Sequence, residues 1–324
     1  NVEGMIRFLI SRYAHEAAWK GVEAPAPLDY PETGLYHPKL KGRITTDPAK
    51  LPQPAMPVGT VGVLMMRSYV LSSDCAHYDA VIAALEARGL RVIPAFAGGL
   101  DGRPAIETFF QDKTGTKIDA LVSLTGFSLV GGPAYNDNDA AIEVLKGLDI
   151  PYIAAHPLEF QTLEQWEASK QGRGPIETTM LIALPELDGA TMPTVFAGRH
   201  DAEVGNGRTM APATERVEML ANRVLRQVRL TQSKPKNRKV GIVLFGFPPN
   251  AGAAGTAAYL DVFRSLLNTL HARKAEGYAL DPPETVEELR ATVLGGSDAQ
   301  YGQEANVAAH DSAAKMVAQT PWLG

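Results

Sequence analysis

The chain has 324 residues, of which 45% are hydrophobic and 21% are charged, and its formal net charge at pH 7 is −5. This composition is typical of a globular protein with one large or two medium domains. The acidic balance argues against nucleic acid and anionic membranes as partners, because both require a basic surface. The single cysteine, Cys75, excludes an internal disulfide and any metal site built from several cysteines.

Residues 1–57 differ in pattern from the rest. Residues 1–20 place apolar side chains at helical spacing, whereas residues 25–57 contain eight prolines and little periodicity. We expect a helix followed by an extended connector on the protein surface. No secretory signal is recognisable, and because the sequence starts at Asn1 we interpret it as a piece of a longer or processed protein.

After the connector, short apolar runs alternate with amphipathic segments. Such alternation predicts βαβ units and a parallel sheet that is covered by helices on both faces. In chain order the predicted elements are strand 61–66, helix 77–89, strand 91–96, helix 104–112, strand 119–125, helix 138–148 with Asn138 as its N-cap, strand 151–155 and helix 162–169.

A more irregular stretch, 172–212, precedes the longest predicted helix, 214–232, which carries one apolar stripe. A second α/β block is then expected to open at Val240, with helices near 256–273 and 284–294. The predicted fold class is therefore α/β, with parallel-sheet βαβ units in two blocks, or lobes, after a Pro-rich N-terminal connector. The expected divisions are 1–57, 58–212 and 213–324.

The opening of the second block is VGIVLFGFPPNAGAAGTAAYLDVF, residues 240–263, with no charged side chain before Asp261. A strand, a glycine-rich loop and a helix in this order can present backbone N–H groups to a ligand. Pro248 and Pro249 argue against a membrane span. The spacing matches neither the P-loop nor the dinucleotide fingerprint, so we expect no nucleotide site.

Ligands of parallel sheets bind at the carboxyl ends of the strands. Four such ends are visible in the sequence, at 67–81, 96–102, 125–139 and 245–256. The glycine pairs in the second and third can serve a ligand or can simply form tight turns.

Two histidines stand in polar turns beside acids, His77 near Asp74 and Asp79, and His200 beside Asp201. An imidazole with a carboxylate partner can shuttle protons or bind a metal, or it can cap a turn on the surface. The seven histidines form no HxxxH or HxH pair, so the sequence signals no zinc site.

Carboxylates at Glu177, Glu186 and Asp188 lie in turn-rich, otherwise apolar surroundings. They can gather a hard cation such as Mg²⁺, which prefers oxygen ligands, or cap helices. A nucleophilic role for Cys75 is not expected, because the neighbouring Asp74 raises rather than lowers the pKa of a thiol.

Several long segments resemble the large H subunit of protoporphyrin magnesium chelatases and, more distantly, the cobaltochelatase large subunit. The segments are HYDAVIAALEARGLRVIPAFAGGLD, SLTGFSLVGGPAYNDNDAAIEVLKGLDIPYIAAHPLEFQTLEQW, ALPELDGATMPTVFAGRHD, VLFGFPPNAGAAGTAAYLDVF and EGYALDPPETVEELRATVL, so the resemblance covers roughly residues 60–320.

The resemblance implies part of a ligase that forms metal–nitrogen bonds, in which the H subunit binds protoporphyrin IX. The AAA+ ATPase partners, the I and D subunits, bind ATP, and Mg²⁺ is inserted in chlorophyll or bacteriochlorophyll synthesis. The implied location is the bacterial cytoplasm or the plastid stroma. The family's HFGTHGSxEFxPG motif is absent, so the chain is expected to be an internal fragment, inactive alone. The alternative is a non-catalytic docking or structural module, of this subunit or of a cobaltochelatase.

Within that resemblance we name two sets of candidate residues. The proton-handling or metal-delivering candidates are His77, Glu177 and His200. The porphyrin-binding candidates are the aromatic and polar residues of two turns, Phe127, Phe245, Phe247 and Asn250.

Overall fold

The computed structural model describes residues 2–26, 29–132, 135–201, 209–244, 259–294 and 311–320. The chain divides into two compact units, residues 1–231 and 232–324.

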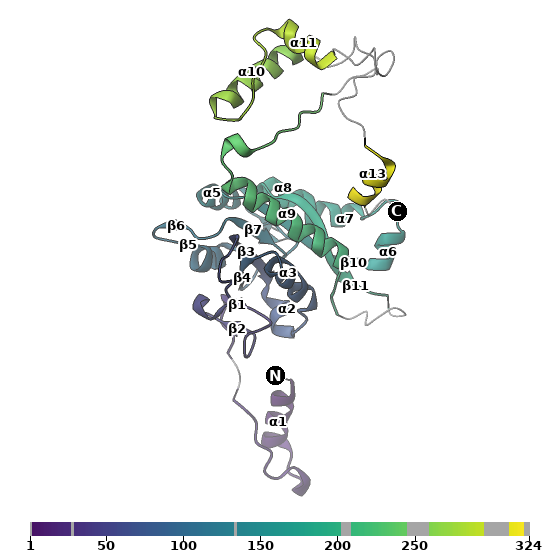
Figure 1. The fold of residues 1–324 in the computed structure, drawn as a ribbon. Helices are drawn as coiled ribbons and strands as arrows, with labels where there is room; N and C mark the ends of the chain where they lie inside the picture. Colours follow the sequence, from purple (N-terminus) through teal and green to yellow (C-terminus); the bar gives the residue numbers. More distant parts are fainter. Residues whose placement is uncertain are drawn as a thin grey trace. The chain divides into compact units, whose positions relative to one another are not determined.

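The first unit is built on an eight-stranded sheet with five parallel strands at its centre (Figure 1). Across the sheet these are β11 (Thr191–Arg199), β10 (Tyr152–Thr162), β7 (Ala120–Ser123), β3 (Gly59–Met66) and β4 (Leu90–Ala97). Among the parallel strands, the chain runs first through β3 and then β4 on one side of it, and then returns to add β7, β10 and β11 on the other. This reversal creates a topological switch point between β3 and β7, which is where doubly wound sheets bind ligands.

The Pro-rich segment contributes strands to this sheet, which corrects its interpretation as a surface connector. Strand β1 (Gly34–Tyr36) pairs antiparallel with β4, and β2 (Ile44–Thr45) pairs with β1. All three residues of β1 are buried. A Cβ added to Gly34 would lie 2.7 Å from the Phe96 ring, so β1 can approach β4 because residue 34 is glycine. Strands of two and three residues are too short to show a period. At the opposite edge, β12 (Ala211–Pro212) pairs antiparallel with β11.

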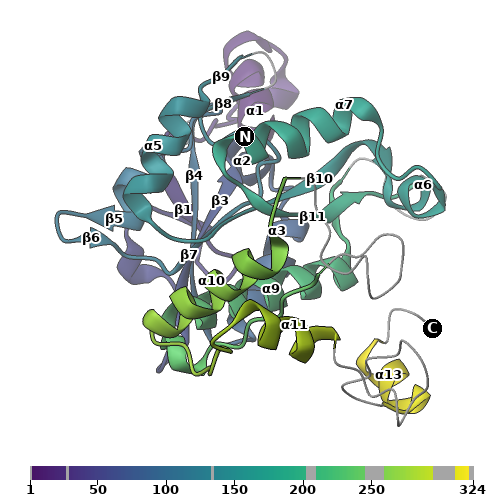
Figure 2. The same ribbon diagram turned by 90° about the horizontal axis from the view of Figure 1, so that it is seen from above.

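Helices cover both faces of the sheet (Figures 1 and 2). On one face α3 (Ala76–Glu86) and α9 (Thr214–Gln232) share a core with β3 and β4. On the other face α5 (Asn138–Leu148), α4 (Arg103–Ala105) and the π-helix Ile106–Phe110 do so. The remaining elements of the unit are α1 (Val2–Tyr13), α2 (Arg67–Ser72), α6 (Leu163–Ala168), α7 (Pro175–Thr178), the π-helix Thr179–Ala183, α8 (Leu184–Asp188), and the hairpins of β5 (Gln111–Asp112) with β6 (Gly115–Thr116) and of β8 (Gly131–Gly132) with β9 (Tyr135–Asn136). Short 3-10 turns occupy Ala17–Trp19 and Pro48–Lys50.

Most predicted elements of this unit form where the sequence places them, and helix 214–232 has the predicted bounds. Its stripe Val217, Leu220, Val224 and Val228 is buried in the core of the first unit. The structural division therefore falls at the end of this helix rather than at the predicted 212/213 boundary. The N-cap of α5 is Asp137, not Asn138, because the Asp137 carboxylate accepts a hydrogen bond from the Ala140 amide at 3.0 Å.

The described part of the second unit is helical. Its elements are the 3-10 turn Pro235–Asn237 and the helices α10 (Val262–Ala275), α11 (Val286–Leu294) and α13 (Ala313–Gln319). Phe263, Leu267 and Leu289 form a small core with Leu244 packed against it. The predicted strand at Val240 is not formed over residues 240–244, and no strand pairs with them within the part of the chain that the structure describes. No helix in the described ranges of either unit is long and apolar enough to cross a membrane.

Candidate functional site at the carboxyl edge of the sheet

A cleft lies at the switch point, where β3, β4 and β7 end. Its walls come from the ends of β3, β4 and β7 and from the loops that follow β4 and β7, and it encloses about 30 Å³. The lining residues are Leu64, Met65, Met66, Ala97, Gly99, Leu100, Asp101, Gly102, Ser123, Thr125, Phe127, Ser128 and Leu129. The structure therefore brings together two of the strand ends that the sequence singled out, 96–102 and 125–139.

Backbone contacts between these two loops shape the cleft. The Gly102 amide donates to the Leu129 carbonyl at 2.9 Å, and the Gly131 amide donates to the Leu100 carbonyl at 2.8 Å. Gly131 has φ 113°, and a Cβ there would lie 2.2 Å from the Tyr135 carbonyl oxygen. This glycine is therefore required by the turn itself, the second of the two interpretations left open by the sequence.

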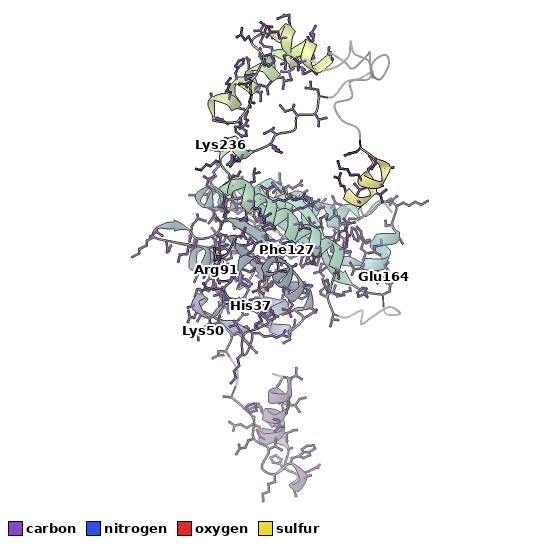
Figure 3. The ribbon with its side chains drawn as sticks, viewed as in Figure 1. His37, Lys50, Arg91, Phe127, Glu164 and Lys236 are labelled. Atoms are coloured by element: carbon purple, nitrogen blue, oxygen red, sulfur yellow. The ribbon has the colours of Figure 1, made fainter. Side chains whose placement is uncertain are left out.

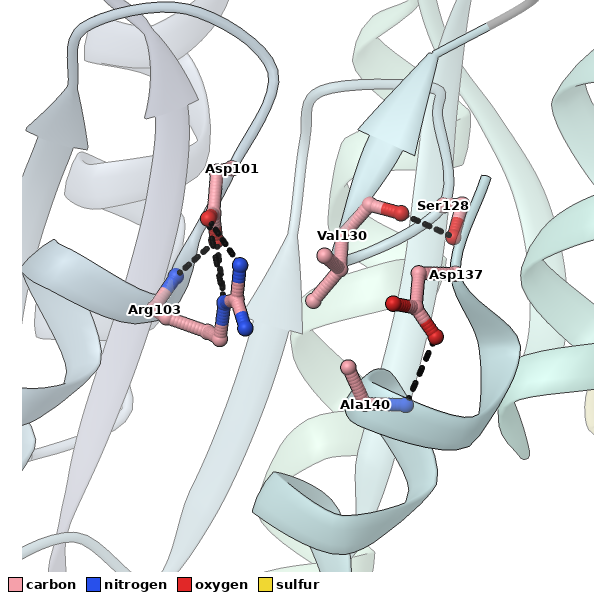
Figure 4. A network of polar contacts seen from close by, with 6 residues as sticks. All are labelled: Asp101, Arg103, Ser128, Val130, Asp137 and Ala140. Atoms are coloured by element: carbon pink, nitrogen blue, oxygen red, sulfur yellow. Dashed lines mark hydrogen bonds and ion pairs between the residues drawn. The ribbon is translucent and has the colours of Figure 1, made fainter. Parts of the chain in front are cut away.

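An ion pair stands at the rim of the cleft. The Arg103 guanidinium donates to the Asp101 carboxylate at 2.6 Å, and the Arg103 amide donates to it at 2.9 Å (Figure 4). Partial burial acts to raise the pKa of Asp101, but the hydrogen bonds and charge of Arg103 outweigh it, so the pKa is lowered. Asp101 is therefore ionised and already paired.

The loop after β7 is held from behind by a buried carboxylate, Asp188 of α8. The Ser128 hydroxyl and the Leu129 amide both donate to its Oδ2, at 2.7 and 2.8 Å. Burial raises the pKa of Asp188, and the two hydrogen bonds act in the opposite direction. Its Oδ1 and the hydroxyl of Tyr152 are buried without a hydrogen-bond partner among the described residues. Asp188 thus anchors this loop, a role that the sequence did not indicate.

Phe127, a candidate porphyrin contact, lines the cleft and is partly exposed (Figure 3). Its amide donates to the Thr125 hydroxyl at 3.3 Å, and that hydroxyl lies 2.9 Å from Oγ of Ser123. These short-range bonds turn the chain at the end of β7 and place the Phe127 ring at the wall of the cleft.

His77 lies in α3, fully buried among aromatic rings. The ring centroids of Tyr78 and Tyr69 lie 3.9 and 5.1 Å from its own, and that of Phe196 lies 5.8 Å away. Burial and the charge of Arg199 lower the pKa of His77 to about 3. Neither ring nitrogen has a hydrogen-bond partner among the described residues. His77 is therefore a neutral core residue in this structure.

The acids that the sequence placed beside His77 pair elsewhere. Asp79 accepts a hydrogen bond from the Tyr36 hydroxyl at 2.6 Å, and Asp74 accepts one from the Met210 amide at 3.0 Å. The expected imidazole–carboxylate pair is thus not formed, because α3 turns His77 toward the core and Asp79 toward Tyr36, while Asp74 lies before the helix and bonds Met210.

Glu177 is also buried. Its carboxylate accepts hydrogen bonds from the Gln161 side chain at 2.7 Å and from the Phe160 amide at 3.2 Å. Nearby in sequence, Arg173 contacts Nε2 of His156, a buried histidine whose pKa is lowered to about 3 by burial and by the Arg173 charge. Sequence reasoning missed His156, although its place directly after the predicted strand 151–155 was a usable signal.

His200 follows β11 and is paired with Glu164 rather than with Asp201. Its Nδ1 lies 2.5 Å from Glu164 Oε1, and the Asp201 amide donates to the other oxygen of Glu164 at 2.9 Å. The bond from His200 lowers the pKa of Glu164 to about 2. The Asp201 carboxylate instead accepts a hydrogen bond from the Thr162 hydroxyl at 2.8 Å. The His200 side chain is 36% exposed, so solvent reaches it.

A further polar group on this edge was not singled out by the sequence. The Tyr69 hydroxyl donates to Glu159 at 2.7 Å, and Arg199 donates to the other oxygen of Glu159 at 3.2 Å. The three residues come from α2, β10 and β11, 90 and 40 positions apart. Burial and the bond to Glu159 raise the pKa of Tyr69, so it remains a phenol and a donor.

Comparison with known proteins gives a consistent result over almost the whole chain. Residues 1–320 match the family CobN/Magnesium Chelatase. The chain belongs to this family. It is 62% identical to the magnesium-chelatase H subunit of Cereibacter sphaeroides across its full length, and 38% identical over 93% of its length to the chloroplastic magnesium-chelatase protein ChlH of Oryza sativa subsp. indica. It spans 28% and 22% of those two proteins.

The fold also has a solved counterpart. The catalytic subunit of cobaltochelatase from Mycobacterium tuberculosis superposes with a TM-score of 0.68 at 23% identity, over 92% of this chain and 24% of that one. At this level of identity the likeness shows the fold alone. The predicted membership of the chelatase family and the α/β fold class are thus confirmed.

Since members of this family are metal chelatases by name, the described residues were compared with the requirements of a metal site. They contain no group of three or more His, Cys, Asp or Glu side chains arranged to hold a metal ion. Two of the carboxylates proposed to gather a cation accept hydrogen bonds from different donors instead, Glu177 from the Gln161 side chain and Asp188 from the Ser128 hydroxyl. The candidates Phe245, Phe247 and Asn250 lie outside the described residues.

Proposed function

We propose that the chain is a segment of the porphyrin-binding H subunit of a magnesium chelatase, which inserts Mg²⁺ into protoporphyrin IX for chlorophyll or bacteriochlorophyll synthesis. The observation that carries this proposal is the 62% identity to a magnesium-chelatase H subunit over the entire chain. The AAA+ partners, the I and D subunits, would hydrolyse ATP, and this segment would form no metal–nitrogen bond alone. The proposed location is the cytoplasm of a bacterium or the stroma of a plastid.

The carboxyl edge of the sheet is the part proposed to face the macrocycle. A tetrapyrrole needs an apolar slot of several hundred Å³, whereas the switch-point cleft encloses about 30 Å³. The cleft therefore cannot enclose the ring. In this proposal Phe127, which lines the cleft, contacts one edge of the macrocycle, and other parts of the subunit complete the slot. Phe245, Phe247 and Asn250 remain candidate porphyrin contacts on sequence grounds alone, because they lie outside the described residues.

Metal insertion also requires removal of two pyrrole protons. Of the three candidates for this role, His200 is reached by solvent, while His77 and Glu177 are 0% and 3% exposed. His200 also lies beside the Glu164 carboxylate, and an imidazole in such a pair can carry protons. We therefore place His200 first among the three, with His77 and Glu177 dependent on a local opening.

A chimera tests the proposal. Residues 1–320 would replace the matching segment of the Cereibacter sphaeroides protein, and Mg-protoporphyrin formation would be measured with the ATPase subunits and ATP. Retained activity is expected. A chimera that folds and binds the ATPase subunits but inserts no Mg²⁺, while a segment from the rice protein does support insertion, would contradict it.

The second candidate function is a docking or structural module that does not touch the macrocycle, of this subunit or of a cobaltochelatase large subunit. The small cleft and the lack of a three-ligand cluster among the described residues favour it. A fluorescence titration with protoporphyrin IX separates the two. Quenching that weakens in Phe127→Ala supports a porphyrin contact, whereas no quenching together with capture of an ATPase subunit supports docking.

A further inference from the structure

A long open groove lies on the first unit between α5 and α9. One part, of about 560 Å³, is lined by the end of α5, the turn into β10 and the turn into β11. A second part, of about 460 Å³, continues along α9. Met192 and Gln227 line both parts, so the two form a single groove.

The groove starts from the amino ends of β10 and β11. The cleft at the switch point lies where β3, β4 and β7 end, and parallel strands place these two sets of ends on opposite edges of the sheet. A molecule in the groove would therefore leave the cleft free.

The floor of the groove is apolar and its rim is basic. Ile142, Leu145, Ile150 and Pro193 are partly exposed along it. The cations are Lys146, Arg223 and Arg226, against one lining carboxylate that is exposed, Asp149.

The rim cations have no acidic partner among the described residues. Lys146 and Arg226 are exposed and form no ion pair within the described residues, and Arg223 donates to the Thr194 hydroxyl at 2.9 Å rather than to an acid. The groove therefore carries a local excess of positive charge on a chain whose formal net charge is −5. This charge complements an acidic ligand with apolar side chains.

We infer that this groove docks an acidic, amphipathic segment of a separate protein. An amphipathic helix places apolar side chains every three to four residues into such a groove and turns its charges to the rim. Exposed rim charges act chiefly by raising the rate at which a diffusing partner meets the surface. This speeds binding of a separate molecule, whereas a segment already tethered nearby does not depend on such an encounter. This argument selects a separate protein over another part of the same polypeptide.

The test uses the full chain and a fluorescein-labelled helical peptide of about 15 residues, with Leu on one face and Glu on the other. Its control peptide carries Gln in place of Glu. The groove variant is Lys146→Glu with Arg226→Glu. The matched control variant, Lys41→Glu with Lys50→Glu, makes the same change in net charge at two exposed lysines elsewhere.

Stopped-flow anisotropy should show binding of the Glu peptide, weaker binding of the Gln peptide, and an association rate that falls about tenfold in the groove variant and little in the control variant. Equal losses in both variants, or no loss in the groove variant, overturn the inference. Binding by this chain but not by a complete large subunit assigns the groove to a segment of the same polypeptide, which also overturns it.

Discussion

The anchoring of the cleft loop by Asp188 leads to a quantitative prediction. Replacing Asp188 by Ala removes the acceptor of the Ser128 hydroxyl and of the Leu129 amide. The hydroxyl can rotate toward the Val130 carbonyl, which lies 3.5 Å away, but the buried amide has no such alternative. An unsatisfied buried donor costs about 1–3 kcal/mol. The lost packing of the side chain adds to this, so we expect Asp188→Ala to lower the free energy of unfolding by about 2–4 kcal/mol.

Asp188→Asn is expected to behave differently. Its amide oxygen can keep both hydrogen bonds and the buried charge is removed, but its NH2 group takes the place of Oδ1, which has no partner among the described residues. We expect Asp188→Asn to lower the free energy of unfolding at pH 7 by about 1–2 kcal/mol, less than Asp188→Ala, because both accepted hydrogen bonds are kept. The control is Glu186→Ala, which removes an exposed acid from the same helix.

The pH dependence gives the sign of the charge effect. Because burial raises the pKa of Asp188 in the folded state, the folded protein binds the proton more tightly than the unfolded chain. The contribution of Asp188 to stability is thus fully present below its unfolded pKa, near 3.9, and is lost as the pH rises through the folded value. The wild type should therefore lose stability relative to Asp188→Asn over that interval.

Urea unfolding at several pH values, followed by circular dichroism, measures these differences. If Asp188→Asn loses as much stability as Asp188→Ala, the loop requires the negative charge itself. The argument that two accepted hydrogen bonds suffice would then be refuted.

Three further predictions follow from the fold. His77→Phe should be at least as stable as the wild type at pH 7. Below about pH 6.5 the free energy of unfolding of the wild type should fall by up to about 1.4 kcal/mol per pH unit, because the imidazole takes up a proton in the unfolded chain but not in the folded core. Urea titrations at pH 7 and 5 measure this, and an equal fall in His77→Phe would contradict it. Gly131→Ala should lower the free energy of unfolding by about 1–3 kcal/mol, because residue 131 has a positive φ. The control Gly147→Ala, in open space on α5, should leave the stability unchanged or raise it. Equal shifts of the melting temperature in the two variants would count against the turn argument. A chain ending at residue 232 should unfold cooperatively. A chain ending at residue 212 should show no cooperative transition, because its core loses the apolar stripe of α9. Cooperative melting of the shorter chain would instead favour the 212/213 boundary predicted from the sequence.

Local pattern was enough to predict the elements. Helix 214–232 has the predicted bounds because its apolar stripe repeats over 19 residues, long enough for the helical period to be unambiguous. The parallel strands were predicted because each is buried on both faces and therefore apolar throughout. Strand β1 was missed because three residues carry no readable period, and its strand character comes from pairing with β4.

The site shows a similar division. Two glycine-containing loops were predicted at strand ends, but only the order of the strands places them on one cleft. The pairing of Asp188 with Ser128 spans 60 positions, and that of Glu164 with His200 spans 36, so no local pattern announces either. His77 and its acidic neighbours were interpreted as a polar turn, because whether a helical residue faces the core depends on what packs against the helix.

The sequence by itself determined the family of this protein, its α/β class and most of its elements, since similarity and periodicity are both properties of residue order. The tertiary structure alone decided which side chains are reachable. It buried His77 and Glu177, left His200 accessible, turned Asp188 into an anchor for the cleft loop and opened a basic groove beside α9. These outcomes depend on contacts between residues far apart in the chain, whose free energies of burial and pairing exist only after the sheet has formed.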